Sequence, residues 1–222
     1  MKLDLNLFTF LSDLSNNNNR VWFKSNKEEF DYFNISIKKY FQRIYELQKS
    51  HFNWDNCKVF RIYRDVRFSK NKLPYKTHFG IAFHREKPKY RGGFYIHLDP
   101  KNSFIAAGFW NPNKDDLYRI RKEIVVDHEY FRSRVNDPNL QKFWGIMKGE
   151  KLKTTPKGFE KGLPSNDLLQ FKQYIFSKKL DNEIIFSEDF GNYIIEHFKA
   201  LLPTLDYFGD VLTTDLNGES LI

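Results

Sequence analysis

The stretch from Phe60 to Phe79 combines a dense set of cations with large apolar neighbours. Its sequence, FRIYRDVRFSKNKLPYKTHF, contains one acid, Asp65, and six cations: Arg61, Arg64, Arg67, Lys70, Lys72 and Lys76. Arginine forks and lysine ammonium groups bind phosphate and carboxylate groups. The stretch therefore predicts a basic cleft for an anion. The alternative is an internal salt-bridge network, although buried ion pairs stabilise a fold less than apolar packing does.

The residue types in this stretch predict how the cations are presented. Alternation along residues 59–67 is typical of a strand and would place Arg61, Asp65 and Arg67 on one face, with Asp65 holding the two guanidinium groups in place. The loop that follows, stiffened by Pro74, adds further candidate ligand groups: Ser69, Lys70, Lys72, Tyr75 and Lys76. We expect Arg20 and Lys157 to close over the same site.

A second group of candidate residues lies in the segment FYIHLDP, residues 94–100. Tyr95, His97 and Asp99 alternate onto one face of a predicted strand. A histidine beside a carboxylate can act as a general base, although histidines on strands often serve only as hydrogen-bonded structural groups. His78, beside the basic loop, is a weaker candidate. An enzyme of hydrolase type would use Asp65 or His97 as its base, with the arginines stabilising a developing anion.

Several well-known catalytic motifs are missing from the sequence. It contains no GxxxxGK[ST] or GxGxxG loop, no HExxH and no nucleophile elbow. Its six histidines are scattered, and its only cysteine is Cys57, so no set of residues has the spacing of metal ligands. We therefore expect neither a metal nor a cofactor.

The hydrophobic periodicity predicts one α+β domain over residues 1–222. Helical spacing covers residues 5–50, alternation typical of strands covers 57–110, and helical spacing returns over 114–215. Within the last part we expect a helix near 166–176, an edge strand near 177–186 and a final helix interrupted at Pro203. Short connections favour an antiparallel meander sheet of four to five strands, with the helices packed mainly on one face.

Composition and charge limit the function further. The 222 residues are 41% hydrophobic and 18% aromatic, which is enough to fill a core, and no stretch has the length and apolarity of a membrane span. We expect a cytoplasmic protein. The net charge is +8, and it is concentrated in the first half of the chain, which favours anionic partners.

Four segments resemble the hallmark blocks of a widespread bacterial and fungal family catalogued as a domain of unknown function and labelled a conserved hypothetical protein. The segments are NNNNRVWF (16–23), FRIYRDVRFSKNKLPYKTHF (60–79), GGFYIHLDP (92–100) and LKTTPKGF (152–159). The resemblance implies hallmark positions that include Asn18, Arg20, Arg67 and Lys157. It implies no particular activity, cofactor or substrate.

Three functions follow from the sequence. The first is a protein that binds an anionic small molecule, either a phosphorylated metabolite or a nucleotide, with nucleic acid ranked lower because the cations cluster in one loop and strand. The second is the enzyme based on Asp65 or His97. The third is an interaction module whose basic face meets an acidic protein, through the segment KALLPTLDYFGDVL of another copy. The sequence leaves the oligomeric state open, and we expect no membrane partner.

Overall fold

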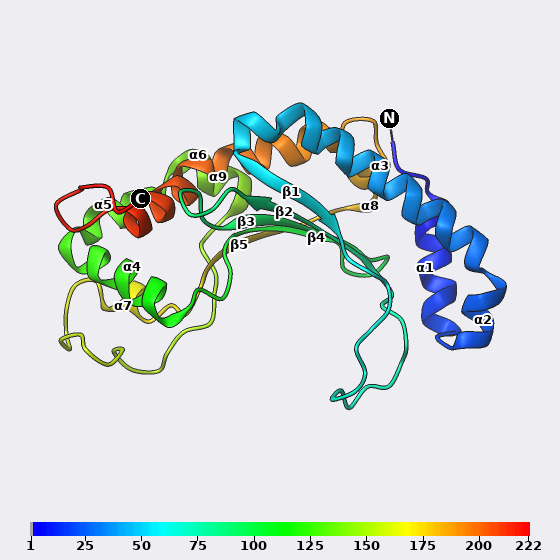
Figure 1. Ribbon diagram of the computed structural model, residues 1–222, viewed down its shortest axis with the longest axis horizontal. Coiled ribbons are helices and arrows are strands. Elements are labelled where there is room, and N and C mark those ends of the chain that lie inside the picture. The colour runs from blue at the N-terminus through cyan, green and yellow to red at the C-terminus, as the bar shows by residue number, and fades with distance from the viewer. Residues whose placement is uncertain (1) are drawn as a thin grey trace. The chain divides into compact units, whose positions relative to one another are not determined.

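The computed structural model describes residues 2–222 and confirms the predicted α+β fold. Within this range nine helices flank a five-stranded antiparallel sheet (Figure 1). The strands follow one another across the sheet in chain order, as in a meander. They are β1 (Trp54–Val59), β2 (Phe79–Arg85), β3 (Gly93–Leu98), β4 (Phe104–Phe109) and β5 (Tyr174–Lys179).

The chain divides into two compact units, each made of three segments. Unit 1 comprises residues 1–83, 95–105 and 179–195, and unit 2 comprises residues 84–94, 106–178 and 196–222. The chain passes from one unit to the other within β2, β3, β4, β5 and α9. The prediction of a single domain stays a prediction.

Unit 1 is built around aromatic side chains of its helices and of the first strands. Its helices are α1 (Asn6–Asn16), α2 (Arg20–Ser25), α3 (Lys27–Phe52), α8 (Asn182–Ile185) and the start of α9 (Phe190–Thr213). Trp54 of β1 stacks on Phe83 of β2, with 4.3 Å between ring centroids, and Phe41 of α3 meets Phe83 edge-on. Each fully buried ring of this size contributes about 1.5–3 kcal/mol, so α3 is fixed against one face of the sheet.

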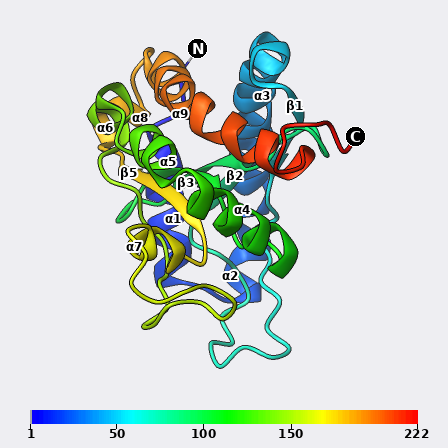
Figure 2. The same cartoon turned by 90° about the vertical axis from the view of Figure 1, so that its left-hand side faces the viewer.

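Unit 2 has a second aromatic core. Its helices are α4 (Lys114–Val126), α5 (His128–Val135), α6 (Pro138–Trp144), α7 (Asn166–Leu169) and the rest of α9 (Figure 2). Tyr174 of β5 lies between Phe131 of α5 and Phe208 of α9, at centroid distances of 5.6 and 5.1 Å. The indole Nε1 of Trp144 donates a 2.6 Å hydrogen bond to the carbonyl of His197 and ties α6 to α9.

Three element predictions in the second half of the chain are wrong. The helix predicted near 166–176 ends at Leu169, and the strand predicted near 177–186 begins earlier, at Tyr174. Tyr174, Ile175 and Phe176 are buried, so packing decides their conformation. Helix α9 also continues through Pro203. A proline inside a helix costs about 3 kcal/mol, which burial of several apolar side chains of α9 offsets.

No helix within residues 2–222 combines the length and apolarity needed to cross a membrane.

Candidate functional site

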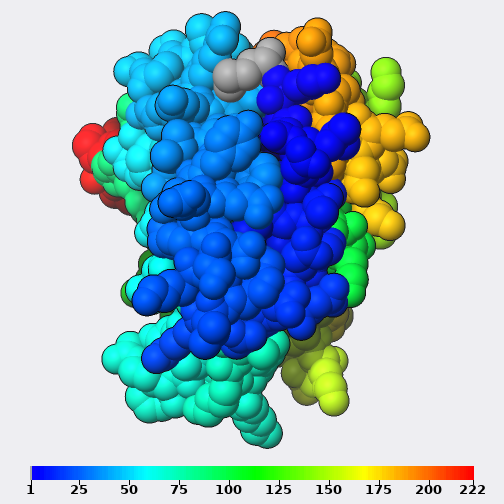
Figure 3. Space-filling model, turned by 90° about the vertical axis from the view of Figure 1, so that its right-hand side faces the viewer, coloured from blue at the N-terminus to red at the C-terminus, as the bar shows by residue number. Residues whose placement is uncertain are grey.

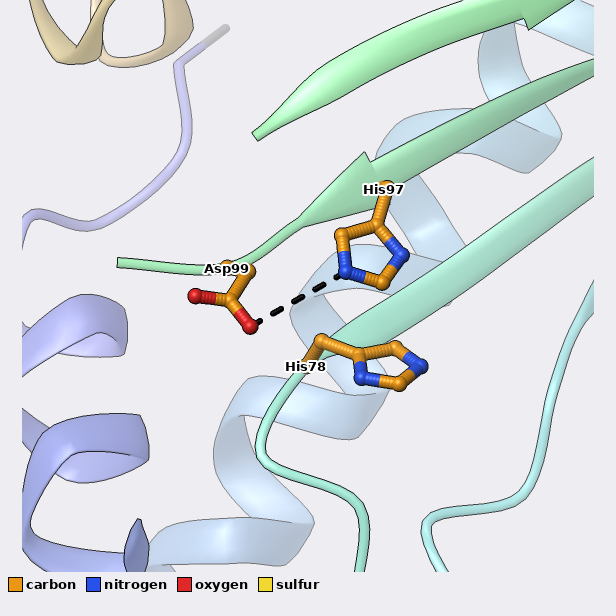
Figure 4. A group of neighbouring side chains, drawn as sticks. All are labelled: His78, His97 and Asp99. Carbon is orange, nitrogen blue, oxygen red and sulfur yellow. Dashed lines mark ion pairs between the residues drawn. The ribbon is translucent and has the colours of Figure 1, made fainter. Parts of the chain in front are cut away.

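Two histidines and one aspartate of unit 1 lie together at the ends of neighbouring strands. His78 directly precedes β2, His97 is in β3, and Asp99 follows β3 (Figure 4). Nε2 of His97 is 3.9 Å from Oδ2 of Asp99, and the two imidazole centroids are 4.1 Å apart. One nitrogen or oxygen atom from each of the three residues lies within 4.8 Å of the others. All three residues are partly buried, so the group is accessible yet shielded.

Neighbouring side chains fix the orientation of His97. Nδ1 of His97 is 3.1 Å from the hydroxyl of Tyr95, which comes from the same face of β3. The Phe104 ring stacks on the imidazole with a centroid distance of 4.7 Å. With Nδ1 held by Tyr95, Nε2 is the nitrogen directed towards Asp99. The sequence prediction that Tyr95, His97 and Asp99 share a face agrees with this arrangement.

Three cations belong to the surroundings of this group. Lys76 and Arg64 are half-buried, and their charges act on His78, while Arg61 acts on Lys76. Lys76 extends over the ring of Phe60, with its Nζ 5.6 Å from the centroid. Within residues 2–222, none of these three cations forms a salt bridge. The charge of Arg61 also acts on Asp65, and that of Asp99 acts on His78, so these two acids offset part of the positive charge of the site.

Burial and positive charge act together on the titratable groups. Burial, followed by the charges of His97 and Lys76, lowers the pKa of His78 to about 4. Burial also lowers the pKa of His97, against the opposing effect of Asp99. The pKa of Lys76 is lowered first by burial and then by Arg61. Both imidazoles are therefore mainly neutral at pH 7.

Comparison with known proteins places the chain in a family. The profile of a conserved hypothetical protein family, DUF2461, matches residues 6–207. The chain belongs to this family. No curated protein and no solved structure matches the chain. The DUF2461 match confirms the resemblance inferred from the sequence, and it covers every residue of the group described above, but it supplies no activity.

The strand predicted for residues 59–67 is wrong in this DUF2461 chain. Strand β1 ends at Val59, and the chain then leaves the sheet as a long loop, residues 60–78 (Figure 1). The two arms of this loop bond to each other: the amide of Arg64 donates to the carbonyl of Pro74, and the amide of Lys76 donates to the carbonyl of Ile62. Phe68, an apolar residue that directly follows the predicted strand, is 96% exposed. The alternation was therefore no guide to burial here.

In the outer part of the loop, charged side chains bond mainly to other groups of the loop. Arg67 forms a two-pronged ion pair with Asp65, with Nε–Oδ1 and Nη2–Oδ2 distances of 3.0 and 2.7 Å. The hydrogen bonds from Arg67 are the main cause of the lowered pKa of Asp65. Nζ of Lys72 donates to the carbonyl of Val66 at 3.0 Å. A carboxylate held in this way is a weak base, and a role for Asp65 as the base of an enzyme stays a prediction.

The inner end of the loop is attached to the turn before α2. The side chain of Asn18 binds the backbone of Tyr75 twice, donating to its carbonyl at 3.0 Å and accepting from its amide at 3.1 Å. The Tyr75 ring is buried and stacks on Phe23, with centroids 4.0 Å apart. Figure 3 shows the loop directly against α2. The Tyr75 ring is therefore part of the packed structure. Exposed Arg20 lies close enough for its charge to act on the Tyr75 hydroxyl.

The remaining predicted residues stay predictions. Ser69 and Lys70 lie in the outer part of the loop, and Lys157 belongs to unit 2. A role for His97 as a general base also stays a prediction. The sequence prediction ranked His78 below His97, and in the structure Thr77 and His78 lie just outside the regular part of β2. The signal that links His78 to the group is its position just before β2, beside β3, where His97 and Asp99 form the pattern His-x-Asp.

A separate hollow in unit 2 has the opposite charge. It has a volume of about 450 Å³, and its lining includes Glu123, Asp127, Asp206 and Asp210. None of the residues predicted from the sequence as site residues lines it. Its acidic lining would repel the anions that the basic group attracts, so it is not the site predicted from the sequence.

Proposed function

We propose that the protein binds a small molecule that carries a phosphate group, at the face of unit 1 where half-buried Lys76 and Arg64 lie near His78 and exposed Arg61 lies near Lys76. The observation that supports this best is that Lys76, Arg64 and Arg61 form no salt bridge within residues 2–222. Like charges gathered at a partly buried position are unfavourable unless an opposite charge joins them. A bound dianion would supply that charge.

The individual groups are suited to a phosphate. Arg64 and Arg61 can each offer a planar fork of N–H donors, and Lys76 adds a point charge on a stem held over Phe60. Imidazole N–H groups of His78 or His97 can donate to further oxygens. A phosphate has enough acceptor oxygens to use several of these donors at once, which a carboxylate cannot do to the same extent.

Isothermal titration calorimetry with inorganic phosphate, phenyl phosphate and a nucleoside monophosphate tests the proposal. Hydrogen bonds to charged groups contribute about 1.5–3 kcal/mol, so Lys76→Gln and Arg64→Gln should each weaken binding by about 10- to 100-fold. Lys38→Gln, an exposed lysine of α3, is the matched control and should leave the affinity unchanged.

Arg67→Gln separates this site from the outer loop. Because Arg67 is already paired with Asp65, its removal should change phosphate affinity less than threefold. The proposal fails if no phosphate compound binds, or if Lys76→Gln and Lys38→Gln bind equally well. Tight binding of an oligonucleotide with a steep salt dependence, lost in Arg67→Gln but not in Lys76→Gln, would instead favour nucleic acid.

A further inference from the structure

The group of His78, His97 and Asp99 has a donor set that the phosphate site does not require. Two imidazole nitrogens and one carboxylate oxygen, contributed by adjacent strand ends, lie within 4.8 Å of one another (Figure 4). Such sets of N and O donors suit borderline transition-metal ions, whereas Mg²⁺ and Ca²⁺ prefer sites made only of oxygen. We propose that His78, His97 and Asp99 are the protein ligands of a divalent transition-metal ion of the Zn²⁺ or Fe²⁺ type.

The distances are compatible with this after a small movement of side chains. Metal–ligand bonds of about 2.0–2.2 Å hold neighbouring donor atoms about 3–3.5 Å apart. Nε2 of His97 and Oδ2 of Asp99 are already 3.9 Å apart. With His97 held in place, rotation of the His78 and Asp99 side chains about their own bonds can bring the three donor atoms, now within 4.8 Å of one another, onto one ion.

The environment of His97 has the features of a metal ligand. Histidine ligands generally use one nitrogen for the metal and donate the other N–H to a nearby acceptor, which fixes the ring. With an ion on Nε2, the Nδ1–H of His97 would donate to the Tyr95 hydroxyl, which is already 3.1 Å away. Phe104 stacks on the ring and limits its rotation. The partner that orients the ligand is thus in place.

Three protein ligands leave coordination positions open. Structural zinc sites are usually closed by four protein ligands, whereas sites with three keep a position for water or substrate. The open positions would lie beside the charges of Lys76 and Arg64. A phosphate oxygen is therefore a suitable additional ligand. The metal site itself does not depend on the proposed function, but this coupling between metal and phosphate rests on it.

Titration of metal-free protein with Co²⁺ tests the proposal, followed by visible absorption and by calorimetry. We expect one ion per chain. His78→Gln and His97→Gln should each raise the Kd at least about 100-fold, since even loss of an outer-shell partner costs 10- to 100-fold. Tyr95→Phe should raise the Kd about 10-fold and change the absorption spectrum less than the histidine variants do.

The matched control is His128→Ala. His128 is also beside a carboxylate, with its Nε2 3.1 Å from Oε1 of Glu129, but it belongs to unit 2 and has no second histidine in the grouping. This variant should bind Co²⁺ as the wild type does. Circular dichroism checks the fold of each variant, and if either glutamine variant is unfolded, Asp99→Asn takes its place in the comparison.

The outcomes distinguish the two proposals. Absence of Co²⁺ binding, or binding that His97→Gln and Asp99→Asn leave unchanged, overturns the metal site even if phenyl phosphate still binds. Binding of Co²⁺ that depends on both histidines supports it even if no phosphate compound binds. Phenyl phosphate should lower the Kd for Co²⁺. An unchanged Kd would overturn the coupling between metal and phosphate but not the metal site itself.

Discussion

Replacement of Asn18 tests whether the basic loop is positioned from outside the site. The Asn18 amide satisfies both backbone groups of Tyr75, at 3.0 and 3.1 Å, in a partly buried position. Asn18→Ala removes both hydrogen bonds. Each contributes about 0.5–1.5 kcal/mol, and a buried backbone group left without a partner costs about 1–3 kcal/mol. We therefore expect a loss of about 2 kcal/mol in the free energy that holds Tyr75 in place.

Hydrogen exchange at the Tyr75 amide measures this loss directly. A change of about 2 kcal/mol corresponds to exchange about 30 times faster, because each 1.4 kcal/mol is a factor of ten. Asn18→Asp keeps the acceptor for the Tyr75 amide but loses the donor to its carbonyl, so it should have a smaller effect at this amide. Asn16→Ala, at an exposed position of α1, is the control and should change stability by less than about 0.5 kcal/mol. An exchange rate in Asn18→Ala within threefold of the wild type would show that Asn18 does not hold Tyr75 in place.

Two further predictions concern unit 2. Hydrogen bonds from Arg132, at 3.0 and 2.9 Å, are the main cause of the pKa of Asp167 lying below its ordinary value of 3.8. The stability that this pair contributes is present above pH 3.8 and is lost as the pH falls through the lowered pKa. Urea unfolding of Asp167→Asn should therefore show a loss of up to about 1 kcal/mol at pH 7, and this loss should shrink in acid. A loss that grows in acid would contradict this prediction. Gly209→Ala should destabilise the protein by about 1–3 kcal/mol, because a Cβ there would lie 2.4 Å from the carbonyl oxygen of Lys89. A Cβ at Gly191, in the same helix, would meet no atom closer than 3.4 Å, so the thermal midpoint of Gly191→Ala should not fall. Equal midpoints for the two variants would show that helix propensity alone decides the effect of alanine at these positions.

Strand β3 could be predicted because buried and half-exposed residues alternate along it. In β3, Phe94, Ile96 and Leu98 are buried and alternate with half-exposed Tyr95 and His97. This pattern fixes both the strand and the face from which His97 projects. Helix α3 was predictable for the same reason, since its buried residues repeat at helical spacing over many turns. The order of β2, β3 and β4 followed from their short connections, whereas the long segment of residues 110–173 separates β4 from β5.

The loop of residues 60–78 was not predictable from alternation. Its conformation depends on hydrogen bonds between its own arms and on Asn18, which is 57 residues away from Tyr75 in the sequence. A residue so distant adds no periodicity to the loop. Cations and apolar residues that alternate near Arg61 therefore suggested a strand, although the buried members of the stretch, such as Ile62 and Tyr75, lie on two different arms.

The charge of the candidate site gives a physical link between the two proposals. Lys76 and Arg64 would repel an incoming divalent cation, and Asp99 supplies only one negative charge to offset it. A phosphate bound among the cations would reduce that repulsion. The metal ion would in turn attract the phosphate. Because coupling between two ligands is reciprocal, whichever binds first should raise the affinity of the other by the same factor. The cations of the site and the His–His–Asp group therefore complement each other: the cations would attract the phosphate, and the bound phosphate would offset their repulsion of the metal ion.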